Sequence, residues 1–174
     1  MLDRLLSHLH VQTQGHEEEV EILVETDDGT LSIGAKRNTL VDRAQGDYIA
    51  FIDDDDLVGP QYVELILEAL KQEPDVVGMN LVMTTNGLTA ERSYHSIYFN
   101  GWSEQPSYLF PDRKEYFRNP NHLNPVKREY ALDTKFPEIS MREDRDYSQR
   151  LFSKLQTEVF IEPPIYFYLF IEGK

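Results

Sequence analysis

The sequence predicts an α/β fold in which helices flank a mostly parallel central sheet. Short apolar segments alternate with amphipathic helical segments through the first half of the chain, a pattern typical of parallel strands joined by helical crossovers. Acidic clusters follow two of the predicted strands, and ligands of open α/β sheets bind at the carboxyl ends of strands. A length of 174 residues suits one core. We therefore expect a single domain, residues 1–174, with a ligand site at the carboxyl ends of its strands.

The chain is expected to alternate helix and strand from its beginning. Leucines at helical spacing over residues 2–9 predict an amphipathic helix. Residues 20–26 are short and rich in β-branched side chains, which predicts a strand ending in an Asp- and Gly-containing loop. Residues 33–46 predict a helix closed by Gly46. Residues 48–52, YIAFI, form a nearly unbroken apolar run, so we expect this strand at the centre of the sheet.

A further helix and strand complete the first half. Pro60, a residue favoured in first helical turns, precedes residues 61–73, whose apolar stripe predicts a helix. Residues 75–85 predict another strand. The alternation up to this point is what favours an α/β fold over other classes.

The second half of the chain is less regular. Residues 93–99 are compatible with a strand, whereas residues 100–125 are rich in Pro, Asn and aromatic side chains and predict a long loop. Residues 143–155 predict a helix with acidic residues in its first turn. The aromatic segment 158–170 predicts one or two strands, broken by its two prolines.

Composition excludes several classes of function. A net charge of −14 argues against binding to nucleic acid polymers, which needs clustered Lys and Arg, and against a basic membrane-surface patch. The absence of cysteine excludes disulfides, thiolate catalysis and Cys-ligated zinc. No apolar run approaches the ~18 residues of a membrane span, and residues 1–10 lack the apolar core of a secretion signal. We expect a cytoplasmic protein without a membrane span.

Three acidic clusters are the candidate functional groups: Asp27 with Asp28, the run from Asp53 to Asp56, and Glu143 with Asp144. Divalent ions such as Mg²⁺ and Mn²⁺ take oxygen ligands, usually one or two carboxylates plus substrate phosphates and waters. Alternate residues of an extended segment point the same way, so Asp53 and Asp55 are expected to face one site. A metal-bound nucleotide diphosphate is the expected ligand. A solvated loop, or a helix cap by Asp56, stays open as a simpler interpretation.

Three segments together resemble the family 2 glycosyltransferases, which have the GT-A fold: VEILVETDDGT, IGAKRNTLVDRAQGDYIAFIDDDDLVGPQYVELIL and REDRDYSQRL. That family pairs an Asp-Asp-Gly-Ser strand end with an Ala-Arg-Asn helix, an Ala-x-Gly-Asp-Tyr segment and an Asp-x-Asp metal motif. The match covers residues 2–83 well and residues 122–170 more loosely. An isolated Asp-x-Asp is weak, but the ordered series is specific. The resemblance implies a Rossmann-like GT-A domain, with residues 2–85 binding a nucleotide sugar and residues 90–174 on the acceptor side.

The resemblance implies roles for the residues that contact the donor. Asp27 would contact the nucleobase, with Asp28 in the same loop. Arg37 would approach the base or the diphosphate, because a planar, permanently charged donor suits phosphate and base edges. Lys36 is its neighbour and the lesser candidate. An exposed helix charge is the alternative interpretation of Arg37.

The Asp-x-Asp motif supplies the implied metal site. Asp53 would touch the ribose and stand close to the metal, and Asp55 would ligate the Mn²⁺ or Mg²⁺ that bridges the diphosphate. Asp54 is a supporting group. His122, in a His-x-x-Pro-x-Lys stretch similar to one in some family members, is a candidate metal or phosphate ligand. A structural role for His122 is the more ordinary expectation, because a lone histidine rarely proves a ligand.

The Glu143–Asp144 pair matches the pair that supplies the catalytic base of the family, and Asp144 is our candidate for that base. The implied mechanism is a single in-line displacement with inversion at the anomeric carbon. A helix N-cap pair is the alternative. Four aromatic residues could form an acceptor platform, although core packing is expected for most of them: Tyr98, Trp102, Tyr108 and Phe110.

The implied function is a metal-dependent, inverting hexosyltransferase that moves a sugar from a nucleotide-diphosphate donor, with a UDP-sugar favoured. The acceptor would be a hydroxyl of a glycan, a lipid-linked sugar or another small molecule. The chain lacks the Ile-Ile-Ile-Pro-Thr-Tyr-Asn type of strand that usually opens the family. A non-catalytic nucleotide- or sugar-binding relative that retains the metal site is therefore the alternative. A nucleotidyltransferase is disfavoured, because no Gly-rich loop followed by a basic residue is present.

Overall fold

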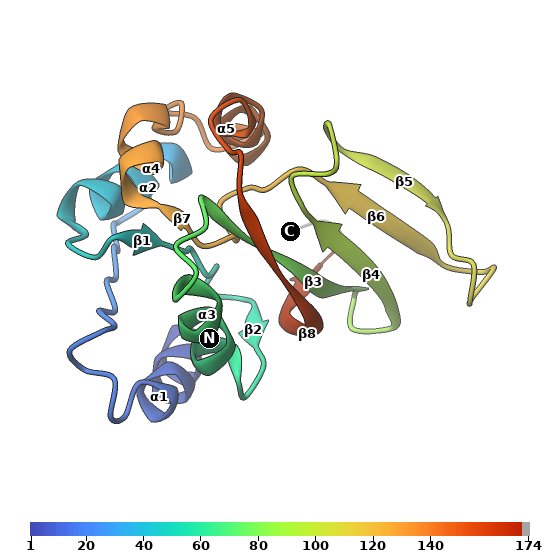
Figure 1. The fold of residues 1–174 in the computed structure, drawn as a ribbon, viewed down its shortest axis with the longest axis horizontal. Helices are drawn as coiled ribbons and strands as arrows, with labels where there is room; N and C mark the ends of the chain where they lie inside the picture. Colours follow the sequence, from blue (N-terminus) through green and yellow to red (C-terminus); the bar gives the residue numbers. More distant parts are fainter. Residues whose placement is uncertain (172–174) are drawn as a thin grey trace.

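The computed structural model describes residues 1–171, in which helices lie on both faces of a mixed sheet (Figure 1). The helices are α1 (Leu2–Gln12), α2 (Ile33–Arg43), α3 (Tyr62–Leu70), α4 (Arg128–Thr134) and α5 (Glu143–Phe152). The strands are β1 (Tyr48–Ile49), β2 (Leu57–Val58), β3 (Val76–Thr85), β4 (Thr89–His95), β5 (Ser103–Pro106), β6 (Lys114–Arg118), β7 (Val126–Lys127) and β8 (Glu158–Phe170). The predicted α/β fold, with helices around a central sheet, is confirmed.

The sheet is organised around β3. Strand β8 runs parallel to β3 along one edge, while β7 and then β4 pair with its other edge in antiparallel orientation. Strand β6 is parallel to β4, and the remaining pairs are antiparallel. The sheet is therefore mixed where we expected a mostly parallel one. The tight turn at Asn86 and Gly87, both with positive φ, returns the chain as a hairpin and makes β3 and β4 antiparallel.

Two predicted strands differ in the structure. Residues 20–26 form no strand, because their backbone has no ladder partner within residues 1–171; side chains of Val20 and Ile22 pack on the core instead. Strand β1 is only two residues long and lies at the end of the strand order, so its predicted central position is wrong. Beyond β1, the N–H of Phe51 donates to the carbonyl of His122 at 3.0 Å rather than extending the ladder.

The predicted helices near residues 2, 33, 61 and 143 are all present as α1, α2, α3 and α5, and the strand predicted at residues 75–85 is β3. Helix α2 ends at Arg43, because Ala44 is extended, and not at Gly46. The loop predicted over residues 100–125 contains the hairpin of β5 and β6. The helix α4 was not expected.

Strand β8 is continuous across its two prolines. Its pairing with β3 shifts register between Met79 and Leu81, opposite the proline pair, so the extra residues are accommodated as an irregularity. The predicted strand over residues 93–99 is β4 in part only. It stops at His95, since the next residues, Ser96 and Ile97, donate hydrogen bonds to the carboxylate of Glu158.

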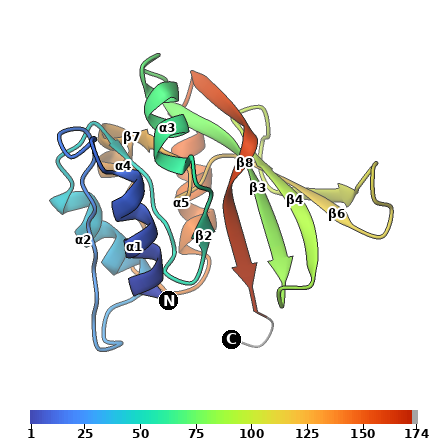
Figure 2. The ribbon, with the colours of Figure 1, turned by 90° about the horizontal axis from the view of Figure 1, so that it is seen from below.

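Two apolar clusters pack on opposite faces of the sheet. Val77 and Met79 belong to the cluster under α1 and α3, whereas Val76 belongs to the cluster under α2, α4 and α5. This division follows from the alternation of side chains along β3, and Figure 2 shows α1 and α3 on one side. Within residues 1–171 no helix is long and apolar enough to cross a membrane.

The end of the sheet that is formed by β4, β6 and β5 has no such helical cover among residues 1–171. Strands β4, β6 and β5 extend beyond the helices in both views (Figures 1 and 2). We call β4, β6 and β5 the uncovered part of the sheet and the rest the helix-covered part. The aromatic side chains of Tyr98, Tyr108 and Phe110 are exposed. The core packing expected for most of the aromatic set is therefore wrong for these three.

Candidate functional site

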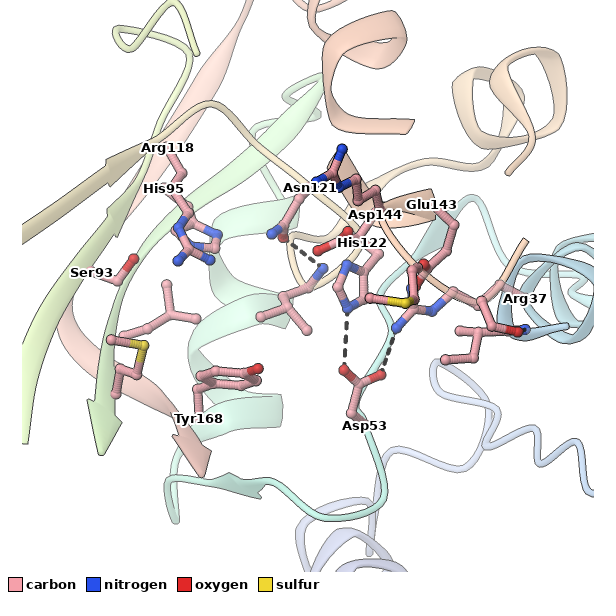
Figure 3. A pocket seen from close by; sticks show the side chains of 17 residues that line it. Arg37, Asp53, Ser93, His95, Arg118, Asn121, His122, Glu143, Asp144 and Tyr168 are labelled. Carbon is pink, nitrogen blue, oxygen red and sulfur yellow. Dashed lines mark hydrogen bonds and ion pairs between the residues drawn. The ribbon is translucent and has the colours of Figure 1, made fainter. Parts of the chain in front are cut away.

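A cleft of about 300 Å³ lies where the helix-covered and uncovered parts of the sheet meet (Figure 3). Its walls come from α2, β3, β4, β6 and β8, from the segment 121–123, and from residues 140–144 at the start of α5. Of the predicted site residues, five line it: Arg37, Asp53, His122, Glu143 and Asp144. Residues separated by up to a hundred positions in the sequence thus meet in one cavity.

Arg37 connects two of the predicted motifs. Its Nη1 donates to Oε1 of Glu143 at 2.8 Å, and its Nη2 donates to Oδ1 of Asp53 at 2.8 Å. The Arg37 side chain is buried at 7% exposure and lies beside the rings of Phe51 and Phe136. Two carboxylates compensate the burial of its charge. The alternative interpretation of Arg37 as an exposed helix charge is therefore wrong.

Asp53 is held ionised by its partners. Burial alone would raise the pKa of Asp53, but the His122 and Arg37 charges and hydrogen bonds hold that pKa well below its usual range. The His122 Nε2 lies 3.4 Å from Oδ2 of Asp53. The other ring nitrogen of His122, Nδ1, is buried without a hydrogen-bond partner among residues 1–171. His122 thus faces the Asp-x-Asp motif, with one nitrogen still to be satisfied.

The acidic run divides into a cleft end and a core end. At the core end, Asp56 is 1% exposed and accepts hydrogen bonds from the Tyr166 hydroxyl at 2.7 Å and the Leu169 N–H at 2.8 Å. Burial raises the pKa of Asp56 to about 6. The Tyr166 hydroxyl also accepts from the N–H of Asp53 at 3.2 Å. Asp56 therefore anchors the run to β8, and it is neither a helix cap nor part of a solvated loop.

The two middle aspartates lie between these ends. Asp54 is exposed, Asp55 is half-buried, and neither belongs to the lining of the cleft. Only Asp53 of the expected Asp53 and Asp55 pair lines it. The expected pairing of Asp53 and Asp55 at one cavity is therefore not seen in the lining of this cleft.

The loop after residue 26 is shaped by Asp27. Its Oδ2 accepts hydrogen bonds from the N–H groups of Leu31 at 2.8 Å and Gly29 at 3.1 Å, and its Oδ1 pairs with Lys36 at 3.0 Å. These backbone bonds and the Lys36 contact lower the pKa of Asp27. Asp28 is exposed. Asp27 and Asp28 thus lie in a loop that Lys36 ties to α2, and none of the three residues lines the cleft.

The acidic pair begins α5 but does not cap it. The N-cap is Arg142, in the left-handed region at φ 67, with no side-chain cap bond. Glu143 turns inward to Arg37, while Asp144 is half-buried, lines the cleft, and accepts the Arg145 N–H at 2.7 Å. The cap interpretation is therefore wrong, although the first turn of a helix favours acidic residues. Both members of the pair line the cleft, and Glu143 is the one paired with Arg37.

The opposite wall was missed by sequence reasoning. Arg118 of β6 lies with its guanidinium carbon 4.5 Å from the ring centre of Trp102. His95 is buried, and its Nδ1 donates a hydrogen bond to Oδ1 of Asn124 at 3.1 Å. Burial lowers the pKa of His95 to about 3, so the ring is neutral. The alternating residues KEYFR of β6 were a strand signal inside the predicted loop.

The residues fit a metal that shares its ligands with a substrate. Within residues 1–171 no three His, Cys, Asp or Glu side chains gather in an arrangement that could hold a metal ion by themselves. Divalent ions of the Mg²⁺ type are commonly held by one or two carboxylates and completed by phosphates and waters. The carboxylates of Asp53, which lines the cleft, and of half-buried Asp55 are of the type that such an incomplete site uses.

Comparisons with known proteins agree with this fold. The TarS 1–349 structure from S. aureus in complex with UDP-GlcNAc matches with a TM-score of 0.62 and 14% identity, over 95% of this chain and 47% of that one. A second crystal structure of S. aureus TarS 1–349 matches with a TM-score of 0.59 and 15% identity, over 92% of this chain and 47% of that one. This likeness shows the GT-A fold, and the chain spans about half the length of these structures.

Sequence comparisons point the same way. A curated protein named "Putative glycosyltransferase EpsH", from Bacillus subtilis (strain 168), is 44% identical over 48 residues, which are 28% of this chain and 14% of that protein. The family model described as glycosyl transferase family 2 matches residues 11–142, well over half of the chain. The chain belongs to glycosyl transferase family 2.

Proposed function

We propose that the protein is a glycosyltransferase that moves a sugar from a nucleotide-diphosphate donor to an acceptor hydroxyl, with a divalent metal and with inversion. The single observation that carries this proposal is the Arg37 contact to both Asp53 and Glu143. It brings the Asp-x-Asp motif and the base motif of the family to one cleft. A cytoplasmic location stays a prediction from the composition.

The donor would lie over the Asp27 loop and the Asp-x-Asp motif. Asp27, Asp28 and Lys36 would bind the base, and Asp53 and Asp54 the ribose side. Structures of TarS are titled as complexes with UDP-GlcNAc and with UDP, which favours a UDP-sugar here. Arg37 is already neutralised by two carboxylates, so we propose that it orients Asp53 rather than binding the diphosphate itself.

Mn²⁺ or Mg²⁺ would be held by Asp55, with Asp53 and His122 close by. When bound, the ion would offset the negative charge on the departing diphosphate. Asp53 would contribute to donor binding by contacting the ribose. Its carboxylate oxygens already face Arg37 and His122.

Asp144 would act as the general base. It would take the proton of the acceptor hydroxyl while that oxygen forms a bond to the anomeric carbon. The bond from the anomeric carbon to the diphosphate oxygen would break on the opposite face, and its electron pair would leave with the nucleoside diphosphate. Glu143 is committed to Arg37, so its proposed role is to position the start of α5.

A second candidate is a relative that binds a nucleotide or sugar without turnover. The absence of a strand over residues 20–26 favours it, because a base-binding segment without ladder hydrogen bonds is held in place by fewer contacts. The catalytic proposal requires that replacing the Asp144 carboxylate removes transfer but leaves donor binding intact, whereas the second candidate predicts no transfer to begin with.

The first experiment is calorimetric titration of UDP and other nucleoside diphosphates into the protein, with Mn²⁺ and then with EDTA. We expect binding of one nucleotide that needs the metal and is lost in Asp55→Ala. Asp112→Ala is the matched control, because it removes an equal charge from an exposed residue outside the lining of the cleft. Absence of nucleotide binding with Mn²⁺, and also when Mg²⁺ replaces it, would overturn the proposal.

A further inference from the structure

We propose that the uncovered side of the cleft is an acceptor subsite for an acidic group, bound by Arg118 with help from Arg145. The group would be a phosphate or carboxylate carried by the acceptor sugar. This inference rests on the proposed function for the direction of transfer, but the binding of an anion by Arg118 can be measured independently of it.

Arg118 is a cation without an ion-pair partner in the described chain. It lines the cleft and is half-buried, and no hydrogen bond or ion pair of its guanidinium is found within residues 1–171, although the Asp144 carboxylate acts on it at longer range. Its neighbours are rings, with Trp102 at 4.5 Å and Tyr116 at 5.7 Å. Arg37, on the other wall, has two carboxylate partners. In a chain with 31 acidic and 17 basic residues, an arginine left without a partner in a cleft is unusual, because a desolvated charge favours a counter-ion.

A second cation approaches the same place from α5. The guanidinium carbon of Arg145 lies 5.9 Å from the ring centre of Trp102, so Trp102 is shared by two arginines. Each planar guanidinium can bind two oxygens of a phosphate or carboxylate at once. Two such groups around one aromatic ring form a compact positive area in a chain whose overall charge repels anions.

An unsatisfied hydroxyl completes this wall. Ser93 is 4% exposed, lines the cleft, and its Oγ has no hydrogen-bond partner among the described residues. Figure 3 shows Ser93, His95 and Arg118 together on one side of the cavity. A buried hydroxyl without a partner costs free energy that a ligand oxygen would recover. The wall therefore combines a charged donor and a neutral donor for an oxygen-rich group.

The position favours the acceptor over the donor. In Figure 3, Asp144 lies between the Arg118 side and the Asp53 and Arg37 side of the cavity. The donor diphosphate is proposed to lie with Asp53 and Asp55, so a molecule on the Arg118 side meets Asp144 from the opposite direction. That is where an acceptor hydroxyl must be to lose its proton to Asp144. The ring of Tyr168, which also lines the cleft, offers a surface for the apolar face of a sugar.

The test uses the single tryptophan of the chain, Trp102, as an optical probe. Fluorescence is followed while glucose 6-phosphate, glucose or inorganic phosphate is added at constant ionic strength. We expect a saturable change with glucose 6-phosphate, a weaker one with inorganic phosphate and none with glucose. Arg118→Gln should weaken glucose 6-phosphate binding about tenfold or more, and Arg118→Lys should fall between, since it keeps the charge but not the fork.

The control is Arg92→Gln, which removes an equal charge from an exposed position on β4 and should bind as the unchanged protein does. If Arg118→Gln does not fold, Arg145→Gln serves in its place, with a smaller loss expected. Equal responses to glucose and glucose 6-phosphate, or unchanged affinity in the arginine variants, would overturn the inference. Inorganic phosphate binding as tightly as glucose 6-phosphate would also overturn it, because the sugar would then go unrecognised.

A separate titration tests whether the acidic group belongs to the donor sugar instead of the acceptor. UDP-glucuronate and UDP-glucose are titrated with Mn²⁺ into the unchanged protein and Arg118→Gln. A preference for UDP-glucuronate that disappears in Arg118→Gln would assign the acidic group to the donor and overturn the acceptor assignment. Retained UDP binding without a glucose 6-phosphate response would defeat this inference alone. A glucose 6-phosphate response without UDP binding would instead defeat the proposed function.

Discussion

The arginines in the helix-covered and uncovered parts of the sheet differ in their partners. In the helix-covered part, Arg37 is buried between Asp53 and Glu143, each 2.8 Å away, and these two carboxylates compensate its charge. In the uncovered part, Arg118 stacks on Trp102, with no carboxylate bound to it in the described chain. An arginine with two internal partners holds structure together, whereas one without a partner is available to a ligand. The cleft lies between these two kinds of site.

The same contrast exists within the acidic run. Asp53 faces the cleft and is stabilised as a charge, while Asp56, three positions later, is buried against β8 and disfavours its charge. Identical side chains in one short segment therefore have opposite electrostatic behaviour, because burial and partners differ. The following changes test the contrast, in order of decreasing effect.

The largest effect is expected from Asp144→Asn, at the junction of the two parts. Loss of the general base should lower turnover about 10²- to 10⁴-fold while the dissociation constant of the nucleotide stays within about twofold. Release of nucleoside diphosphate from a transferred donor measures the first quantity, and calorimetry measures the second. Asp146→Asn, whose side chain pairs with Arg150 along α5, is the control. Turnover equal to that of the unchanged protein would remove Asp144 from the mechanism.

The next largest effect is expected from Arg37, whose charge is already paired within the protein. Arg37→Ala leaves Asp53 and Glu143 without their shared partner, and breaking a buried ion pair in this way costs about 3 kcal/mol or more of unfolding free energy. Urea unfolding followed by circular dichroism gives the value. Arg92→Ala, on the exposed surface of β4, should change it by less than about 0.5 kcal/mol. A loss below about 1 kcal/mol in Arg37→Ala would mean that Arg37 is not a structural clamp.

A smaller, pH-dependent effect is expected at the core end of the acidic run. The pKa of Asp56 is raised to about 6 in the folded protein, so the folded state binds a proton more tightly than the unfolded chain does. Its contribution to stability is therefore full below about pH 4 and is lost as the pH rises through about 6. Asp53, with a lowered pKa, has the opposite sign and stabilises above about pH 4.

Asp56→Asn isolates the first of these contributions. The unfolding free energy should fall by about 2 kcal/mol between about pH 4 and pH 7 for the Asp56 component alone. The difference between the unchanged protein and Asp56→Asn, measured by urea unfolding at several pH values, should therefore show this slope. A difference that does not vary with pH would show that Asp56 titrates as an ordinary exposed carboxyl.

The smallest effect is expected on the uncovered part of the sheet. Tyr108 is 95% exposed, so Tyr108→Ser should change the unfolding free energy by less than about 0.5 kcal/mol. Thermal and urea unfolding of the variant provide the measurement. A larger loss would indicate that Tyr108 packs against something, as the sequence had first suggested for the aromatic set, and that the uncovered part is covered in solution.

Local patterns in the sequence carried much of the fold. Each of the helices α1, α2, α3 and α5 follows an apolar stripe that can be recognised within a window of about a dozen residues. All four helices are present. Strand order was not so local. The Asn86–Gly87 turn is a hairpin signal, yet nothing within residues 48–52 tells that β1 ends the sheet, because that depends on β7, which is formed more than seventy residues later.

The sequence by itself determined the chemistry of the site: two acidic clusters at the ends of apolar segments, a third at the start of a helix, and an arginine in a helix between the first two. Only the tertiary structure decided which of these groups meet. It placed Arg37 against Glu143, 106 positions away, separated Asp53 from Asp56, and left Arg118 without an ion-pair partner among residues 1–171. The physical reason is that residue type sets what a side chain can bind, whereas burial and long-range contacts set what it does bind.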